Sequence, residues 1–141
     1  MKNIFLLFMA ASIYLPVNAQ QVKTDSSMSA NRIVGVWQTS DQKAQITIIR
    51  QDSLYQGKLS NATLSLNKTI NLSLPTGLLG IYILRDLKFN GDDRWDGMIF
   101  DPESKNTYKC FVKLDNDGKM KVRGYKGISL FGKSQYWNRL K

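Results

Sequence analysis

The sequence predicts an all-β chain that folds into a small antiparallel up-and-down β-barrel of eight to ten strands. Segments in which apolar and polar residues alternate recur along most of the chain, which is the pattern of half-buried strands. Turn-forming residues separate these segments at short intervals, as in hairpins between consecutive strands. No long window after residue 19 carries a clean helical stripe. Many short strands without an obvious edge strand favour a closed barrel over an open sheet.

Residues 1–19 have the organisation of a secretory signal peptide. Lys2 precedes an apolar run over residues 4–15, and Val17-Asn18-Ala19 supplies a cleavage-site pattern. The run is too short to cross a bilayer as a stable helix, and no other stretch approaches that length. We therefore expect this segment to be removed and the remaining chain to be periplasmic or secreted, and not membrane-spanning.

The rest of the chain divides into a leader and one domain. Residues 20–31 are polar and lack periodic apolar positions, which predicts a flexible leader. Residues 32–141 have the length of a single domain with one core. Cys110 is the only cysteine, so no intramolecular disulfide can form and stability must come from packing.

The first half of this domain contains a predicted strand, a hairpin and an ambiguous segment. Residues 33–40 form the first strand, and residues 45–50 and 53–60 form a hairpin around a tight connection. Over residues 64–74, apolar side chains fall on even positions and polar ones mostly on odd positions. Either one long strand or two strands joined at Asn67-Lys68 explains this pattern.

The second half contains further hairpins. Residues 80–89 and 95–101 flank an Asn-Gly-Asp-Asp turn, and the next turn leads into residues 107–114. Residues 119–123 alternate after another turn. The last predicted strand, residues 133–140, ends the domain.

A glycine, two tryptophans and an arginine suggest how the two ends of the domain meet. Gly35 and Trp37 lie in the first strand, and Trp137 and Arg139 in the last. This arrangement resembles the calycin signature of lipocalins and their relatives. The resemblance implies that the arginine packs over the first tryptophan and closes the barrel, a contact worth on the order of 0.5 to 2 kcal/mol.

A longer resemblance covers residues 35–139 with one gap. The motifs are Ile-Phe-Asp-Pro followed by Tyr108, Met-Lys-Val-Arg-Gly at residues 120–124, and Gly-Lys-Ser-Gln-Tyr-Trp-Asn-Arg at residues 132–139. They resemble the bacterial domain-of-unknown-function family 2147 (DUF2147). The resemblance implies an exported lipocalin-like barrel and brings no established activity. Residues 61–76 depart from the family pattern, because a leucine-rich alternation replaces the usual Asp- and Asn-Pro-containing loop.

The composition argues against an enzyme. The chain has no histidine, so it lacks the commonest general base and the commonest zinc ligand. Cys110 lies on a predicted apolar face, where a thiol is usually an inert small hydrophobe. We therefore expect no catalytic residues, no cofactor and no metal.

One acidic stretch has the residue types that a calcium site uses. Asp92, Asp93, Asp96, Asp101 and Glu103 are close in sequence, but their spacing does not match an EF-hand loop. Aspartate is also an ordinary residue of tight turns. The structural interpretation is therefore preferred.

The chain is basic, with 20 Lys and Arg against 11 Asp and Glu and a formal net charge of +9. Five basic residues should share the outer face of one hairpin, either as a solvated face or as a patch for an anionic envelope component. Nucleic acid is not expected as a partner, and the chain is expected to be a monomer. The predicted patch consists of Lys109, Lys113, Lys119, Lys121 and Arg123.

An eight-stranded barrel is wide enough either to fill itself with side chains or to hold one small ligand. The first hypothesis is a non-enzymatic exported barrel that binds a small apolar or amphipathic molecule, such as an acyl chain. The alternative is a filled barrel whose surface binds an envelope protein or anionic polymer. In the first hypothesis the predicted lining is Ile46, Ile48, Met98, Phe100, Tyr108, Cys110, Val112, Met120 and Val122.

Overall fold

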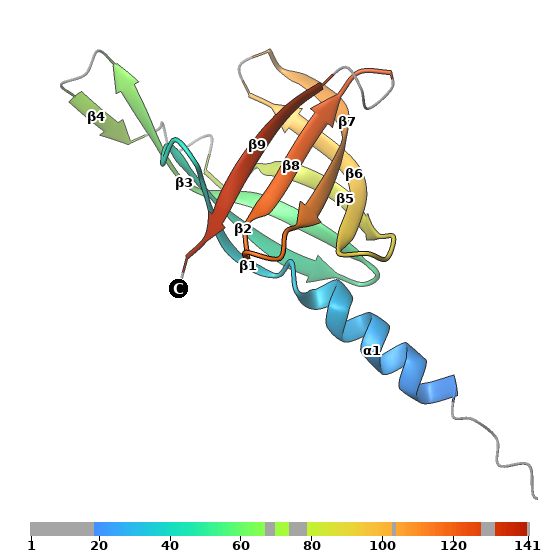
Figure 1. Ribbon diagram of the computed structural model, residues 1–141. Coiled ribbons are helices and arrows are strands. Elements are labelled where there is room, and N and C mark those ends of the chain that lie inside the picture. Colours follow the sequence, from blue (N-terminus) through green and yellow to red (C-terminus); the bar gives the residue numbers. More distant parts are fainter. Residues whose placement is uncertain (1–18, 67–69, 74–78, 103, 128–131, 141) are drawn as a thin grey trace, which may run out of the picture.

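The computed structural model describes residues 19–66, 70–73, 79–102, 104–127 and 132–140 (Figure 1). One helix precedes nine strands. The elements are α1 (Ala19–Asn31), β1 (Gly35–Thr39), β2 (Ala44–Gln51), β3 (Leu54–Leu66), β4 (Ile70–Ser73), β5 (Tyr82–Phe89), β6 (Arg94–Asp101), β7 (Asn106–Leu114), β8 (Met120–Tyr125) and β9 (Gly132–Arg139).

Eight of these strands close into a barrel. The sheet order is β2-β1-β9-β8-β7-β6-β5-β3, and pairing of β2 with β3 joins the two ends of that row. Every pairing is antiparallel. Apart from the crossing between β3 and β5, each strand neighbours the strand that precedes it in the chain. The predicted up-and-down barrel is therefore confirmed.

The leader differs from its prediction. Residues 20–31, expected to be a flexible leader, belong to the helix α1. The helix has no apolar stripe because it does not lie along the barrel, and Figure 1 shows that only its C-terminal end meets the strands. The segment therefore carries no helical periodicity of apolar residues. Among the described residues, no helix has the length and apolar character needed to cross a bilayer.

The C-terminal end of α1 seals one end of the barrel, which we call the α1 end. The indole Nε1 of Trp95 donates to the carbonyl oxygen of Ala30 at 3.2 Å, and that of Trp37 donates to the carbonyl oxygen of Ile33 at 2.9 Å. The Tyr55 hydroxyl donates to Oδ1 of Asn31 at 2.8 Å. Buried indole N–H groups thus find acceptors in the segment that covers them.

The predicted closure between the first and last strands is confirmed. Trp37 pairs with Arg139 across β1 and β9, and the guanidinium Cζ lies 4.3 Å from the centre of the Trp37 ring system. Nη1 donates to the Val34 carbonyl at 2.8 Å, and Nη2 donates to the Arg32 carbonyl. Gly35 has a φ of 142°, and a Cβ there would clash with Nη1. Glycine is thus required for the guanidinium to approach.

Outside the ring, β3 continues into a hairpin with β4. Leu64 pairs with Leu72, and Leu66 pairs with Ile70. Of the two explanations for residues 64–74, two strands are therefore present, and residues 67–69 lie outside the described residues. Figure 1 shows the hairpin projecting beyond the barrel.

The contact between α1 and the barrel can be tested with Asn31→Ala. Loss of the acceptor for the Tyr55 hydroxyl should lower the free energy of unfolding by about 1–2 kcal/mol in urea denaturation. Met28 lies on the same helix and is 67% exposed, so Met28→Ala should change the free energy by less than about 0.5 kcal/mol. Equal effects of the two variants would contradict a sealing role for the helix end.

Candidate functional site

The inner face of the barrel is filled by large side chains at the α1 end. Trp37, Trp95, Trp137, Tyr55 and Met120 are all among the fully buried side chains. The Tyr55 and Trp95 rings pack edge to face, with centroids 6.5 Å apart. This half of the barrel is a packed core.

Towards the opposite end, which we call the mouth end, the inner side chains become smaller or polar. Along β8 the inner positions run from Met120 through Val122 to Gly124. Along β9 they run from the buried Trp137 to Gln135 and Lys133, which are exposed. Directly paired residues share a face of an antiparallel sheet, and Gln135 pairs with Val122 and Lys133 with Gly124. The inner face therefore meets solvent at this end.

A row of small residues crosses three strands where the inner face begins to open. Cys110 on β7 pairs with Gly97 on one side and with Gly124 on the other. Ile99 fills part of the space, because a Cβ at Gly124 would lie 3.1 Å from its Cγ2. Cys110 is only 1% exposed, so it belongs to the packed core on which the open part of the inner face ends.

The inner residues near this opening form the candidate site, which we call the mouth cluster: Ile99, Tyr108, Gly124, Lys133 and Gln135. Ile99 and Tyr108 pair with each other and are half-buried. The Trp137 Nε1 donates to Oε1 of Gln135 at 3.1 Å, so the amide NH₂ of Gln135 is its remaining donor group. The cluster combines an apolar wall with an amide donor and an ammonium.

Most of the predicted lining lies on the inner face, but in its packed part. Tyr108 alone among the predicted lining residues belongs to the mouth cluster. Six others are buried on the inner face: Ile46, Ile48, Cys110, Val112, Met120 and Val122.

By register, Met98 and Phe100 belong to the outer face of β6, so their prediction as inner residues is wrong, although the half-buried Phe100 still packs against the core. The inner positions of this strand are Trp95, Gly97 and Ile99, which pair with the inner residues of β7. Met98 pairs with the exposed Lys109. Both faces of β6 carry apolar residues, and the Arg85 guanidinium covers the Phe100 ring at 5.1 Å. The alternation of apolar residues therefore does not show which face of β6 points inward. Gly97, at an inner position, has no side chain to indicate that face.

Lys133 and Gln135 were not predicted as site residues. The signal was available in principle, because both share the odd-numbered face of the last strand with Trp137. Where polar residues follow a buried tryptophan on the same face of a strand, they indicate that the core ends there.

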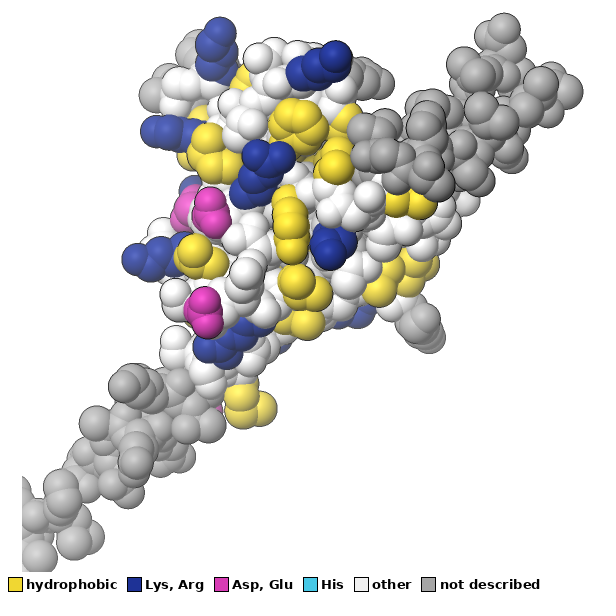
Figure 2. Space-filling view, turned by 180° about the vertical axis from the view of Figure 1, so that it is seen from behind, with side chains coloured by type: hydrophobic (Ala, Val, Ile, Leu, Met, Phe, Trp, Pro, Cys, Tyr) yellow, Lys and Arg dark blue, Asp and Glu magenta, His cyan; other side chains and the backbone are white. Residues whose placement is uncertain are grey.

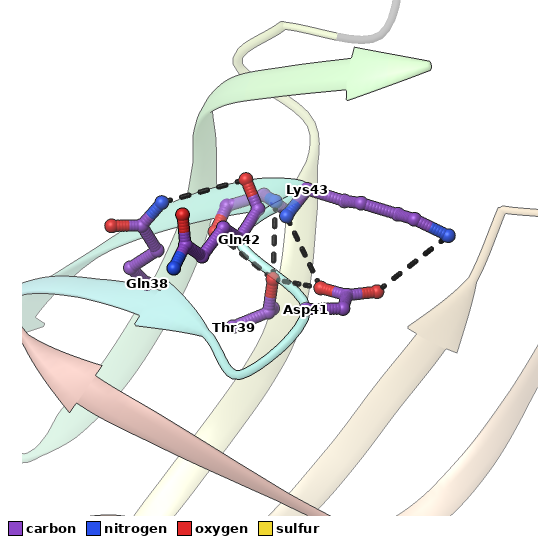
Figure 3. Close-up of polar contacts among 6 residues, drawn as sticks. Gln38, Thr39, Asp41, Gln42 and Lys43 are labelled. Carbon is purple, nitrogen blue, oxygen red and sulfur yellow. Dashed lines mark hydrogen bonds and ion pairs between the residues drawn. The ribbon is translucent and has the colours of Figure 1, made fainter. Parts of the chain in front are cut away.

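A locally fixed turn joins β1 to β2 (Figure 3). The Thr39 hydroxyl donates to Oδ1 of Asp41 at 2.6 Å, and the Lys43 amide donates to the same oxygen at 3.1 Å. The hydrogen bond from Thr39, followed by those from the backbone and the charge of Lys43, lowers the pKa of Asp41. The Ala44 amide donates to the Thr39 hydroxyl at 3.1 Å.

The predicted basic patch lies on the outer face of the β7–β8 hairpin and its turn. Lys113 pairs directly with Lys121, whereas Arg123 pairs with Phe111. Lys119 forms an ion pair with Asp117 at 2.9 Å. Positive charge is not confined to this hairpin: Figure 2, seen from behind, shows Lys and Arg side chains spread among apolar ones.

The acidic stretch serves turns and ion pairs in the described part of the chain. Asp92 and Asp93 have φ values of 51° and 54° in the β5–β6 turn. Asp93 pairs with Arg32 at 2.6 Å, and Asp96 pairs with Arg94 at 2.7 Å. Among the described residues, no three Asp, Glu, Cys or His side chains group as metal ligands would. Glu103 lies outside the described residues.

The chain is similar to one family of bacterial proteins and to one solved structure. A family model described as "Uncharacterized protein conserved in bacteria (DUF2147)" matches residues 35–139. The fold is similar to that of protein HP1028 from Helicobacter pylori, described as belonging to the lipocalin family. The TM-score is 0.60 and the sequence identity 18%, over 77% of this chain and 83% of that chain. At that identity the likeness shows the fold alone. No curated protein sequence matches the chain significantly.

Burial of Cys110 should make stability fall at alkaline pH. Desolvation, with a smaller contribution from Asp96, raises the pKa of its thiol from 9.0 to about 12. Above pH 9 the unfolded chain loses this proton while the folded chain keeps it, so stability falls as pH rises from 9 towards 12. The loss at pH 10 should be about 1 kcal/mol.

Chemical denaturation of the wild type and of Cys110→Ala across this pH range measures the effect. Stability of the Ala variant should decline less steeply with pH, because it lacks the Cys110 thiol proton. All other titrating groups are the same in the two proteins. Parallel declines would contradict the assignment of this proton to Cys110.

Proposed function

The chain belongs to the DUF2147 family of bacterial proteins, and we propose that it is an exported, non-enzymatic barrel that binds a small apolar or amphipathic molecule at its mouth end. An acyl chain is the ligand class that fits best. The observation that carries the proposal is the change along the inner face from buried tryptophans to the half-buried or exposed mouth cluster. A lipocalin-like barrel of this size can hold one small ligand.

The apolar wall would hold the tail of such a ligand. Ile99 and Tyr108 expose part of their surface on the inner face, and Ile99 packs against the glycine at position 124. Burial of a methylene group contributes about 0.8 kcal/mol, so a few carbons of an acyl chain suffice for appreciable affinity. The packed floor limits how deeply the tail enters.

The polar side of the mouth cluster would hold an anionic head group. Lys133 places an ammonium on the inner face, two residues from the Gln135 amide. An ammonium and an amide donor together suit a carboxylate. A fatty acid is therefore the simplest probe of the proposal.

The non-enzymatic part rests on the chemistry that the chain carries. The sequence has no histidine. Burial keeps the Cys110 thiol protonated at neutral pH, and a protonated thiol is a poor nucleophile. Export rests on the signal-peptide pattern of residues 1–19 and is part of the proposal.

A second candidate function is surface binding by a barrel with a filled interior. It is favoured by the aromatic side chains that lie under basic ones on the outer face. The Arg94 guanidinium lies 4.2 Å from the centre of the Phe111 ring, next to the basic patch. A guanidinium over a ring face is stabilised by about 0.5–1 kcal/mol at an exposed site, which holds this cation beside the patch.

Fatty-acid titration of single variants distinguishes the two functions. Ile99→Ala should weaken binding of a long-chain fatty acid about tenfold, because the inner wall loses apolar surface. Met98→Ala changes the neighbouring residue on the outer face and should leave binding unchanged. Lys133→Glu should weaken binding, whereas Lys109→Glu, the same charge change on the outer face, should not. Isothermal titration calorimetry measures each case.

Equal affinity in all four variants would exclude the mouth cluster as the binding site. Absence of fatty-acid binding in the wild type, together with weakened polymer binding by Lys109→Glu, would favour the surface function instead.

A further inference from the structure

A shallow depression of about 340 Å³, which we call the β9 depression, lies over the outer face of β9. Tyr136 and Asn138 flank the buried Trp137 in this strand, so they point away from the barrel interior. The other lining residues come from the β1–β2 and β7–β8 turns on the two sides of β9. The complete lining is Ser40, Asp115, Asp117, Lys119, Tyr136 and Asn138. The depression is therefore separate from the mouth cluster, which lies on the inner face.

Both turns that border the depression are held by their own hydrogen bonds. In the β7–β8 turn, the Asp115 amide donates to the Lys119 carbonyl at 2.9 Å. In the β1–β2 turn, the Ala44 amide donates to the hydroxyl of Thr39 at 3.1 Å, and Thr39 directly precedes Ser40 (Figure 3). Walls that are fixed before a ligand arrives lower the entropic cost of binding.

The Tyr136 side chain gives the depression an apolar surface. It is 44% exposed, although the next residue in the strand, Trp137, is buried. The Lys121 ammonium lies 5.9 Å from the centre of the tyrosine ring and leaves much of the ring open to solvent. A tyrosine ring offers a large, rigid contact surface with a hydroxyl at its edge.

Polar groups around this ring are available to a ligand. Among the residues that the structure describes, the side chains of Ser40, Asp115 and Asn138 donate and accept no hydrogen bond. A hydroxyl and an amide can each donate and accept, and a carboxylate accepts. The depression thus surrounds an exposed ring with both kinds of hydrogen-bonding group.

The charges of the lining favour a neutral ligand. Two aspartates repel an anion, and Lys119, which pairs with Asp117 at 2.9 Å, opposes a cation. In the described part of the chain, no three carboxylates, thiols or imidazoles group as metal ligands. A purely apolar ligand would cover the Asp115 carboxylate without replacing its water. A neutral molecule with an apolar face and several hydroxyls fits the lining better than any of these.

We propose that the β9 depression binds a neutral pyranose unit of a glycan, with the sugar ring against Tyr136 and its hydroxyls at the surrounding polar groups. One face of such a ring carries mainly C–H groups, which suit an aromatic surface. The Asp115 carboxylate would accept from sugar hydroxyls, and charge-assisted bonds of this kind are the stronger ones. This site is independent of any ligand at the mouth cluster.

Titration followed by nuclear magnetic resonance tests the proposal. The full-length chain is expressed, and its purified product is titrated with three neutral trisaccharides: maltotriose, cellotriose and the trimer of N-acetylglucosamine. At least one of them should bind at millimolar concentration and shift the backbone amide signals of β9 and the two turns. The corresponding monosaccharide should bind more weakly, and an anionic trimer of galacturonic acid should bind about tenfold more weakly or not at all.

Two pairs of matched variants locate the site, and all four positions are exposed, so folding should be retained. Tyr136→Ala should weaken binding of the neutral trisaccharide about tenfold. Tyr82→Ala removes another exposed tyrosine that lies beside a lysine, on β5, and should change binding less than about twofold. Asn138→Ala should weaken binding about fivefold, whereas Asn106→Ala, at the start of β7, should not.

Three results would overturn the proposal. The first is that none of the neutral trisaccharides shifts any amide signal of the wild type. The second is equal loss of binding in Tyr136→Ala and Tyr82→Ala, which would indicate unspecific contact with exposed aromatic rings. The third is preferred binding of the galacturonic acid trimer that Lys109→Glu abolishes, which would place glycan binding on the basic patch.

Discussion

The stack of Arg139 on Trp37 is the interaction on which the rest of the structure depends. One guanidinium covers an indole in the first strand and donates hydrogen bonds to the carbonyls of Val34 and Arg32. It thereby joins the last strand, the first strand and the segment that leads from α1. These are the most distant segments of the domain in sequence, so their contact carries a large entropic cost of loop closure. Gly35 is needed because the guanidinium occupies the position of a side chain.

Closure at that point determines which half of the inner face is filled by side chains and which end is exposed to solvent. The lead-in from α1 supplies acceptors for the indoles of Trp37 and Trp95, and large side chains then fill the adjoining half of the inner face. An eight-stranded barrel has little interior volume, so this half has little room for a ligand. Solvent meets the inner face at the other end, beside the row in which Cys110 lies between Gly97 and Gly124.

The barrel fold could be predicted from the sequence more fully than the candidate site could. Alternation and turn residues predicted the strands, and Gly35, Trp37 and Arg139 predicted the closure. The face of β6 could not be predicted, because Phe100 is shielded outside by Arg85 and Gly97 gives no apolar signal inside. The helix α1 was missed because it contacts the barrel at its end and needs no apolar stripe. The site itself depends on where the inner face stops being buried, which a local pattern does not encode.

Native mass spectrometry tests the central claim, that the mouth end holds a small apolar or amphipathic molecule. The protein is purified from the envelope of its own host and its mass is compared before and after denaturation. The account predicts a stoichiometric adduct in the mass range of an acyl lipid that is released on unfolding and is lost in Ile99→Ala/Lys133→Glu. An unliganded mass that persists after incubation with envelope lipids and fatty acids would contradict it.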